Sequence, residues 1–240
     1  MRRERRKVTV NDHVTAELLR RVAANATPLR DGDEALIAKQ LGRLPRGLVG
    51  VGARCACGAP AVTVTSPRLP DGTPFPTLFY LTLPWVVRAV SRLEAAGEMV
   101  RFNARLASDT EFAAAYELAH HSYLQRRALL GEVSEIAGVS AGGMPRRVKC
   151  LHALAGYSLA VGAGVCLVGD MTLEAVGWDP NVCRCSESDG VAEWEPGAAA
   201  KSAPAAGAAA EPAPMANAAA KSAPAAGAAA EPDGEATGNG

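Results

Sequence analysis

The order of apolar and polar residues predicts a sheet followed by helices. Two short segments rich in Val, Thr and Gly, residues 47–54 and 61–65, are separated by Cys-Ala-Cys-Gly-Ala-Pro, a pattern typical of a β-hairpin. Residues 77–82 are a third candidate strand. From Pro84 onward apolar residues recur with a period of 3.6, which indicates helices. The pattern predicts an α+β fold in which a small N-terminal antiparallel sheet packs against a mostly helical C-terminal half.

Capping and breaking residues set the bounds of the predicted helices. The segment Asp33–Leu41 begins with a capping residue and stops before Gly42. Three further helices are expected from Pro84 to Gly97, from Asp109 to about Leu130, and from Pro145 onward, with a last short turn at 173–176.

Both ends of the chain differ from its middle. Five basic residues lie within 2–7, so residues 1–12 are predicted to be a basic, flexible N-terminus. The fifteen residues AAAKSAPAAGAAAEP occur at 198–212 and again at 218–232, and their prolines and glycines interrupt every alanine run. We expect residues 187–240 to be a disordered low-complexity tail and residues 13–186 to be a single globular domain.

Composition limits the classes of function. The 25 basic residues balance the 25 acidic ones, which removes any argument for binding of nucleic acid or of an anionic membrane by bulk charge. No run approaches 18 apolar residues and no apolar segment follows the basic start, so we predict a cytoplasmic protein without a membrane span or secretory signal. Six cysteines are too few for a disulfide scaffold, which leaves buried thiols, metal ligands or a reactive thiol.

Two loops are candidate ligand-binding elements. Residues 67–77 hold four prolines and an Asp-Gly turn, so this loop is rigid and either positions a substrate or simply crosses the end of the sheet. Its candidate substrate residues are Asp71, Gly72, Thr73 and Thr77. Residues 138–150 run from a glycine-containing loop into a predicted helix N-terminus, which favours an anion, although an ordinary loop-to-helix junction has the same pattern. The anion-binding candidates there are Gly142, Gly143, Arg146, Arg147 and Lys149.

Cys150, His120 and His152 are the candidate catalytic residues. Basic neighbours and a helix N-terminus favour the thiolate of Cys150, although a small buried side chain is the alternative. His120 borders the apolar stripe of its predicted helix while His121 faces away, so His120 is either a base or a structural residue. On a regular helix Cys150 and His152 point to opposite sides, and they can share one metal ion only if residues 150–152 are extended or locally distorted.

Zinc is the cofactor that these residue types suggest. Two Cys-x-Cys pairs, Cys55 with Cys57 and Cys183 with Cys185, could close a four-cysteine site, although the common structural spacing is Cys-x₂-Cys. The other candidate is a mixed metal site whose ligands are Cys55, His120, Cys150 and His152. Unliganded thiols are the third interpretation.

Several long motifs resemble a known family. Residues 67–82, residues 90–94, Ala119-His120 with Tyr123, and residues 142–152 resemble the bacterial domain-of-unknown-function family five hundred and one, over about residues 37–178. That family implies no established reaction. Its pattern matches Cys55, Asp71, Gly72, Thr73, Pro74, Phe75, Pro76, Tyr80, Thr82, His120, Tyr123, Gly143, Lys149, Cys150 and His152. Because Cys57, Cys183 and Cys185 lie outside the pattern, the resemblance favours the mixed Cys/His site.

We therefore expect a cytoplasmic protein with a Cys/His site, able to hold zinc, beside the Pro-rich loop. The first alternative is a thiol-dependent enzyme in which Cys150 attacks a small anionic substrate and His120 or His152 is the base. The second is a non-catalytic module that binds a protein or a nucleic acid, with nucleic acid disfavoured by the balanced charge.

Overall fold

The sheet has three antiparallel strands in the order β1-β2-β3. In the computed structural model, which describes residues 14–187, they are β1 (Leu48–Arg54), β2 (Pro60–Thr65) and β3 (Phe79–Leu81). Valine and threonine suit this extended, tightly packed geometry, and all six residues of the central strand β2 are buried. The predicted hairpin and third strand are confirmed.

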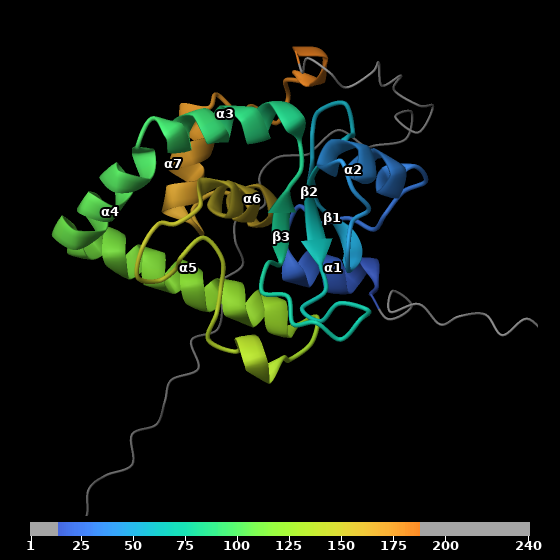
Figure 1. Ribbon diagram of the computed structural model, residues 1–240, viewed down its shortest axis with the longest axis horizontal. Helices are drawn as coiled ribbons and strands as arrows, with labels where there is room; N and C mark the ends of the chain where they lie inside the picture. Colours follow the sequence, from blue (N-terminus) through green and yellow to red (C-terminus); the bar gives the residue numbers. More distant parts are fainter. Residues whose placement is uncertain (1–13, 188–240) are drawn as a thin grey trace, which may run out of the picture. The chain divides into compact units, whose positions relative to one another are not determined.

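Seven helices accompany the sheet in the described part of the chain, and most of them lie in its C-terminal half (Figure 1). They are α1 (Ala16–Val22), α2 (Asp33–Leu41), α3 (Pro84–Ala95), α4 (Glu98–Ser108), α5 (Thr110–Ala128), α6 (Leu151–Val161) and α7 (Leu167–Ala175), with short 3₁₀ turns η2 (Ser134–Ile136) and η3 (Cys185–Glu187). The predicted α+β fold is confirmed.

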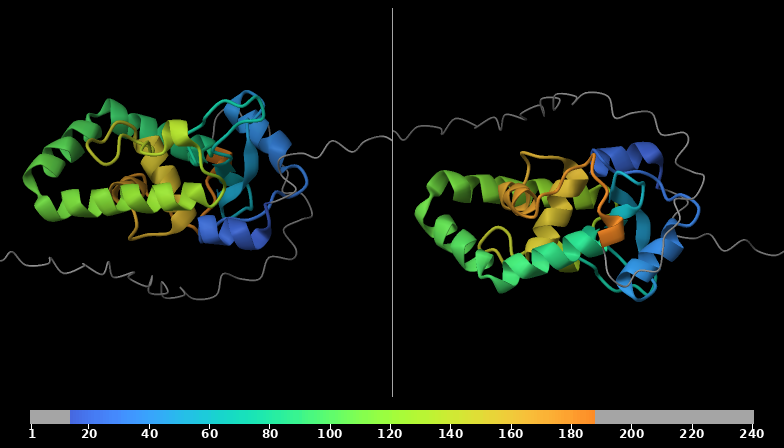
Figure 2. Two further views of the ribbon diagram at one scale, coloured as in Figure 1. Left: turned by 90° about the horizontal axis from the view of Figure 1, so that it is seen from below. Right: turned by 90° about the horizontal axis from the view of Figure 1, so that it is seen from above.

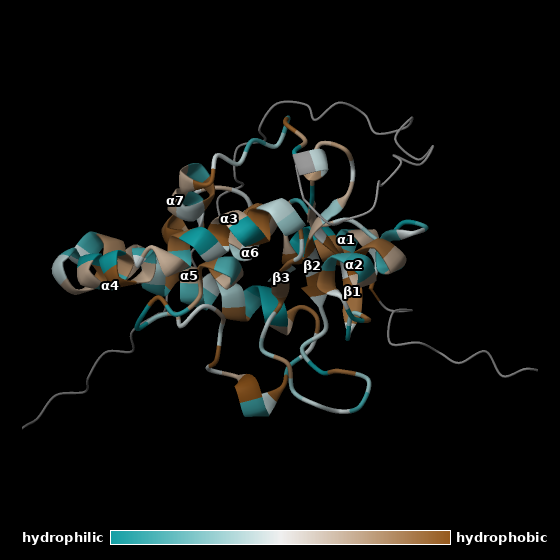
Figure 3. Ribbon diagram, turned by 45° about the horizontal axis from the view of Figure 1, so that its top comes forward, coloured by the Kyte–Doolittle hydropathy of each residue, from teal (hydrophilic) through white to brown (hydrophobic). Residues whose placement is uncertain are grey.

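Helix α6 is the centre of the packing. Every residue from Leu154 to Val161 is buried, as expected for a helix that is apolar all round. It contacts all three strands and α7, while α3, α4 and α5 run around it (Figures 1 and 2). The outer helices carry both hydrophilic and hydrophobic residues (Figure 3). On α7, Gly169 allows the closest approach, since a Cβ there would lie 2.2 Å from the Leu154 carbonyl oxygen of α6.

The helix bounds agree with the sequence prediction in part. Helices α2 and α5 begin and end close to the predicted positions, and the Asp109 side chain caps α5 by accepting from the Phe112 N–H. Helices α1 and α4 were not predicted, and α7 is longer than the expected turn at 173–176. The prediction that a helix opens at Pro145 is wrong, because α6 begins at Leu151.

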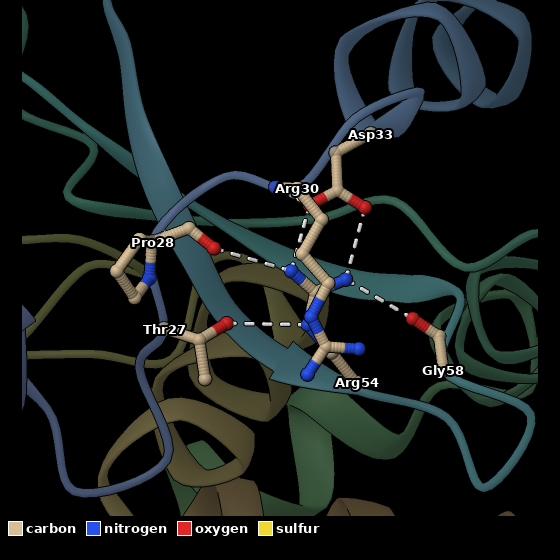
Figure 4. A network of polar contacts seen from close by, with 6 residues as sticks. All are labelled: Thr27, Pro28, Arg30, Asp33, Arg54 and Gly58. Atoms are coloured by element: carbon tan, nitrogen blue, oxygen red, sulfur yellow. Dashed lines mark hydrogen bonds and ion pairs between the residues drawn. The ribbon is translucent and has the colours of Figure 1, made fainter. Parts of the chain in front are cut away.

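A buried ion pair fixes the connection between β1 and β2. The Arg54 guanidinium pairs with the Asp33 carboxylate at 2.7 and 2.9 Å, and it also donates to the carbonyl oxygen of Gly58 at 3.0 Å and to Thr27 (Figure 4). Bidentate pairs of this kind are strong and directional. The network joins α2 and the segment before it to the turn at residues 55–58.

Two side chains of α5 hold the loops on either side of the pocket. The Tyr123 hydroxyl accepts from the Leu78 N–H at 2.6 Å and donates to the Pro76 carbonyl oxygen at 3.2 Å. The buried Arg127 guanidinium donates to the carbonyl oxygens of Pro76 and Val139. These bonds connect the Pro-rich loop to the loop that precedes α6.

No helix within residues 14–187 is long and apolar enough to cross a membrane. The predictions for the basic cluster at residues 2–7 and for the repeats at 198–232 lie outside the described residues.

Candidate functional site

A pocket of about 1140 Å³ lies where β3, the start of α6 and the loop at residues 138–149 meet. It is lined by most of the residues that the sequence put forward. The three catalytic candidates His120, Cys150 and His152 all line it, and so do Gly142, Gly143, Arg146, Arg147, Lys149 and Thr77.

The loop before α6 needs two glycines. Gly142 and Gly143 have φ values of +66° and +95°, a region that side chains disfavour. A Cβ on Gly143 would also lie 2.5 Å from the Arg147 carbonyl oxygen. The Gly142 carbonyl oxygen accepts from the N–H groups of Lys149 and Cys150. This compact turn replaces the helix expected from Pro145 onward.

Cys150 occupies the N-cap position of α6. Its backbone is extended, with φ −152° and ψ 113°, while Leu151 and His152 are helical. The expected departure from a regular helix therefore occurs at Cys150 alone, and it brings the Cys150 sulfur close to the His152 ring. The Leu151 N–H, at the first helical position, donates to Glu94 Oε1 at 2.6 Å. The ligand atoms of Glu94, Cys150 and His152 all lie within 4.8 Å of one another.

The His152 ring lies among oxygen atoms. Its Nδ1 is 3.1 Å from Glu94 Oε1, and its Nε2 is 3.1 Å from both the Val87 carbonyl oxygen and Ser91 Oγ. The hydrogen bond with the Cys150 thiol, followed by the charge of Glu94, raises the pKa of His152 to about 9 against the opposing effect of burial. His152 is therefore an imidazolium at neutral pH, with both ring N–H groups facing acceptors.

The pKa of His120 is shifted in the opposite direction from that of His152. Ser140 Oγ donates to the Met144 carbonyl oxygen at 3.3 Å, so the same oxygen accepts from His120 Nδ1–H at 2.8 Å. Burial lowers the pKa of His120 below its ordinary value. A neutral ring with Nδ1 protonated leaves the lone pair on Nε2. The prediction that His120 is the enclosed member of the histidine pair is confirmed by its burial, while His121 is exposed.

The pocket also contains polar groups that the protein does not pair. Arg146, Arg147 and Lys149 are exposed and have no carboxylate partner within residues 14–187. Thr82 is buried, and its hydroxyl has no hydrogen-bond partner among the described residues. Leaving a buried hydroxyl unpaired costs about 1–3 kcal/mol. Thr82 is one of the residues that line the pocket.

The Pro-rich loop contributes less to the pocket than the sequence suggested. Of its four candidate substrate residues, Thr77 lines the pocket and Asp71, Gly72 and Thr73 do not. Asp71 pairs with Arg46 and accepts from the Thr73 N–H, and these contacts lower its pKa. Asp71, at the tip of the loop, is thus held by Arg46 and by the Thr73 N–H.

The mixed metal site is not formed by the described residues, and this is a correction. Cys55 lies with Cys57, Cys183 and Cys185, whose sulfur atoms are all within 4.8 Å of one another. His120, Cys150 and His152 line the separate pocket. The reason is that Cys55 directly follows β1, on the turn to β2, where it meets Cys185 of the segment after α7.

Sequence reasoning missed four residues of the pocket environment. Glu94 and Ser91 on α3 hold His152, Ser140 holds His120, and Thr82 lies in the lining with a hydroxyl that is unpaired among the described residues. The motif at residues 90–94 contains the first two, and its match to the family pattern was the available signal.

Comparison with sequence models of protein families matches residues 51–174 to the description "Protein of unknown function (DUF501)". The matched segment contains the pocket residues from Thr77 to Ala153, together with Cys55 and Cys57, and ends before Cys183. Searches of curated proteins and of solved structures gave no match.

Proposed function

The chain belongs to the family of proteins of unknown function DUF501, and because that membership supplies no activity, we propose from the pocket a thiol-dependent enzyme that acts on a small anionic substrate. One observation carries the proposal. Cys150, the imidazolium of His152 and three basic side chains that have no carboxylate partner among the described residues share a single pocket.

The walls define the class of substrate. Arg146, Arg147 and Lys149 supply positive charge for a phosphate or carboxylate group. Val87, Val139 and Ala153, which are not buried, supply an apolar surface. Ligand sites commonly combine such walls with a few polar groups that fix orientation. The substrate is therefore a small molecule with one anionic end and one apolar part.

The two histidines have different roles in this proposal. Both His152 nitrogens already donate to oxygen atoms, so His152 acts as a fixed positive charge beside the Cys150 sulfur. The N-terminus of α6 adds a positive partial charge at the same place. His120, with a lone pair on Nε2, is the proton carrier. Glu94 is a positioning residue, since it acts through His152.

The proposed reaction is nucleophilic group transfer. The Cys150 thiolate attacks the electrophilic centre of the substrate, a bond to sulfur forms, and the leaving group departs with the proton that the thiol gave to His120. Water then attacks this intermediate, its hydroxyl remains on the product, and its proton returns to the thiol.

The experiment measures alkylation of Cys150 by iodoacetamide in the full chain, followed by mass spectrometry of each cysteine. We expect Cys150 to react faster than a small free thiol at pH 7. Cys166 is the internal reference, because burial raises the pKa of its thiol to about 12 and it should remain unmodified. Millimolar pyrophosphate or malonate should slow the reaction of Cys150.

Variants identify the anion site. The double variant Arg146→Ala/Arg147→Ala should lose the protection, whereas Arg101→Ala should keep it, since Arg101 pairs with Glu98 on α4 and does not line the pocket. If Cys150 reacts no faster than a small thiol, or if neither anion slows it, the proposed function is wrong.

A further inference from the structure

Four cysteines from distant parts of the chain meet at one place. Cys55 and Cys57 lie on the turn between β1 and β2, and Cys183 and Cys185 lie after α7, where η3 returns beside the start of α3 (Figure 1). Cys185 Sγ is 3.5 Å from Cys57 Sγ and 3.7 Å from Cys55 Sγ. All four sulfur atoms lie within 4.8 Å of one another.

The sulfur spacing suits a tetrahedral metal ion. Zinc binds thiolate sulfur at about 2.3 Å, and a tetrahedron with that radius has edges of about 3.8 Å. A disulfide requires about 2.05 Å between two sulfur atoms. A disulfide would bring Cys185 close to one partner only. Its sulfur atom is instead nearly equidistant from those of Cys55 and Cys57.

Backbone donors point at the sulfur atoms. The Cys185 N–H donates to Cys183 Sγ at 3.5 Å, the Cys57 N–H donates to the Cys55 thiol, and the Ala59 N–H donates to the Cys57 thiol. Hydrogen bonds to ligand atoms orient them and stabilise their anionic form, which is the role of the shell around a metal centre.

Both halves of the cluster are held in place without the metal. On one side, the Gly58 N–H donates to the Cys55 carbonyl oxygen at 2.8 Å, and Arg54 holds the Gly58 carbonyl oxygen (Figure 4). On the other side, the Arg184 guanidinium lies 5.4 Å from the centre of the Trp85 ring, and Trp85 stacks on Trp178. The positive charge of Arg184 also favours a centre with four thiolates, whose net charge with zinc is negative.

We propose that Cys55, Cys57, Cys183 and Cys185 bind one zinc ion. Four protein ligands close the coordination shell, so the ion is structural and leaves no position for a substrate. It joins the segment after α7 to the turn between β1 and β2. The site is separate from the pocket, whose lining includes none of the four cysteines, and the inference does not depend on the proposed function.

The first test is metal analysis of the full chain, purified in reducing buffer without chelator. We expect one zinc ion per chain, and we expect it to be lost in the double variant Cys183→Ser/Cys185→Ser. The matched controls Cys150→Ser and Cys166→Ser lie outside the cluster and should retain zinc. Sub-stoichiometric zinc that added zinc does not restore, or equal zinc in the double variant, would overturn the proposal.

A second test uses the unmodified chain, in case the double variant does not fold. Cys183 is exposed, so its thiol should react quickly with iodoacetamide unless a metal ion holds it. We expect Cys183 to be protected in the purified protein and to react at least tenfold faster after a strong zinc chelator is added. Equal rates with and without chelator, or a disulfide within the cluster in protein isolated with its thiols blocked, would contradict the assignment.

Discussion

Replacing Glu94 with Gln should lower the pKa of His152 and flatten the dependence of stability on pH above neutrality. The change removes a charge and little else, because a Gln Oε1 can still accept from the Leu151 N–H and from His152 Nδ1–H. The matched control is Glu98→Gln, which removes a carboxylate from an exposed pair with Arg101 on α4.

The magnitude follows from the contacts of His152. Its pKa rises from 6.5 to about 9, and each pH unit corresponds to about 1.4 kcal/mol, so the protonated ring stabilises the fold by at most about 3.5 kcal/mol. Cys150 makes the largest contribution, and the His152 side chain is 25% exposed. We therefore assign about one pH unit, or about 1.4 kcal/mol, to the charge of Glu94.

The sign is set by the direction of the change. The folded state holds the His152 proton more tightly than the unfolded state does, so this stabilisation is complete below pH 6.5 and is lost as pH rises through about 9. In the Glu94→Gln variant protonated His152 should stabilise the fold less, so a smaller part of the free energy of unfolding should be lost as pH rises. Between pH 7 and pH 10 its free energy of unfolding should fall by about 1 kcal/mol less than that of the Glu98→Gln control.

Two measurements check this prediction. Nuclear magnetic resonance titration of the His152 ring gives the pKa directly, and urea unfolding at pH 7 and pH 10 gives the free energies. A His152 that titrates near 6.5 in the unchanged protein would refute the reasoning, as would equal His152 pKa values in the unchanged protein and the Glu94→Gln variant.

Three further substitutions test the packing around the pocket. Tyr123→Phe leaves the buried Leu78 N–H without its acceptor. It should lower the free energy of unfolding, measured in urea, by about 1–3 kcal/mol. No loss would mean that another acceptor replaces the hydroxyl. Gly169→Ala should lower the free energy of unfolding by more than about 3 kcal/mol and lower Tm, because the new Cβ would overlap the Leu154 carbonyl oxygen. An unchanged Tm would contradict the close approach of α6 and α7. Thr82→Val removes an unpaired hydroxyl at nearly constant volume and should leave the free energy of unfolding unchanged or slightly higher, whereas a loss above about 1 kcal/mol would mean that the hydroxyl has a partner.

The parts of the fold that sequence could predict are those decided locally. The Asp109 cap, the hairpin around residues 55–58 and the different exposure of His120 and His121 all follow from neighbours within a few positions. The start of α6 does not. Leu151 begins the helix because Glu94, 57 positions away, accepts its N–H. The periodicity of apolar residues within the segment cannot predict a hydrogen bond to so distant a residue.

The same distinction explains what happened to the candidate sites. Both Cys-x-Cys pairs were recognised, but their meeting depends on a contact across 128 positions, and the family pattern pointed away from it. The predicted mixed metal site was wrong because it combined cysteines and histidines by residue type alone. In the folded chain Cys55 and the other three residues lie in different surroundings. Cys55 has three thiols around it, an arrangement that suits a closed metal site, whereas Cys150 has an imidazolium, a carboxylate and open space, which suit a reactive thiol. The two different roles that we propose for cysteine therefore rest on which charges and thiols lie within about 5 Å of each sulfur atom.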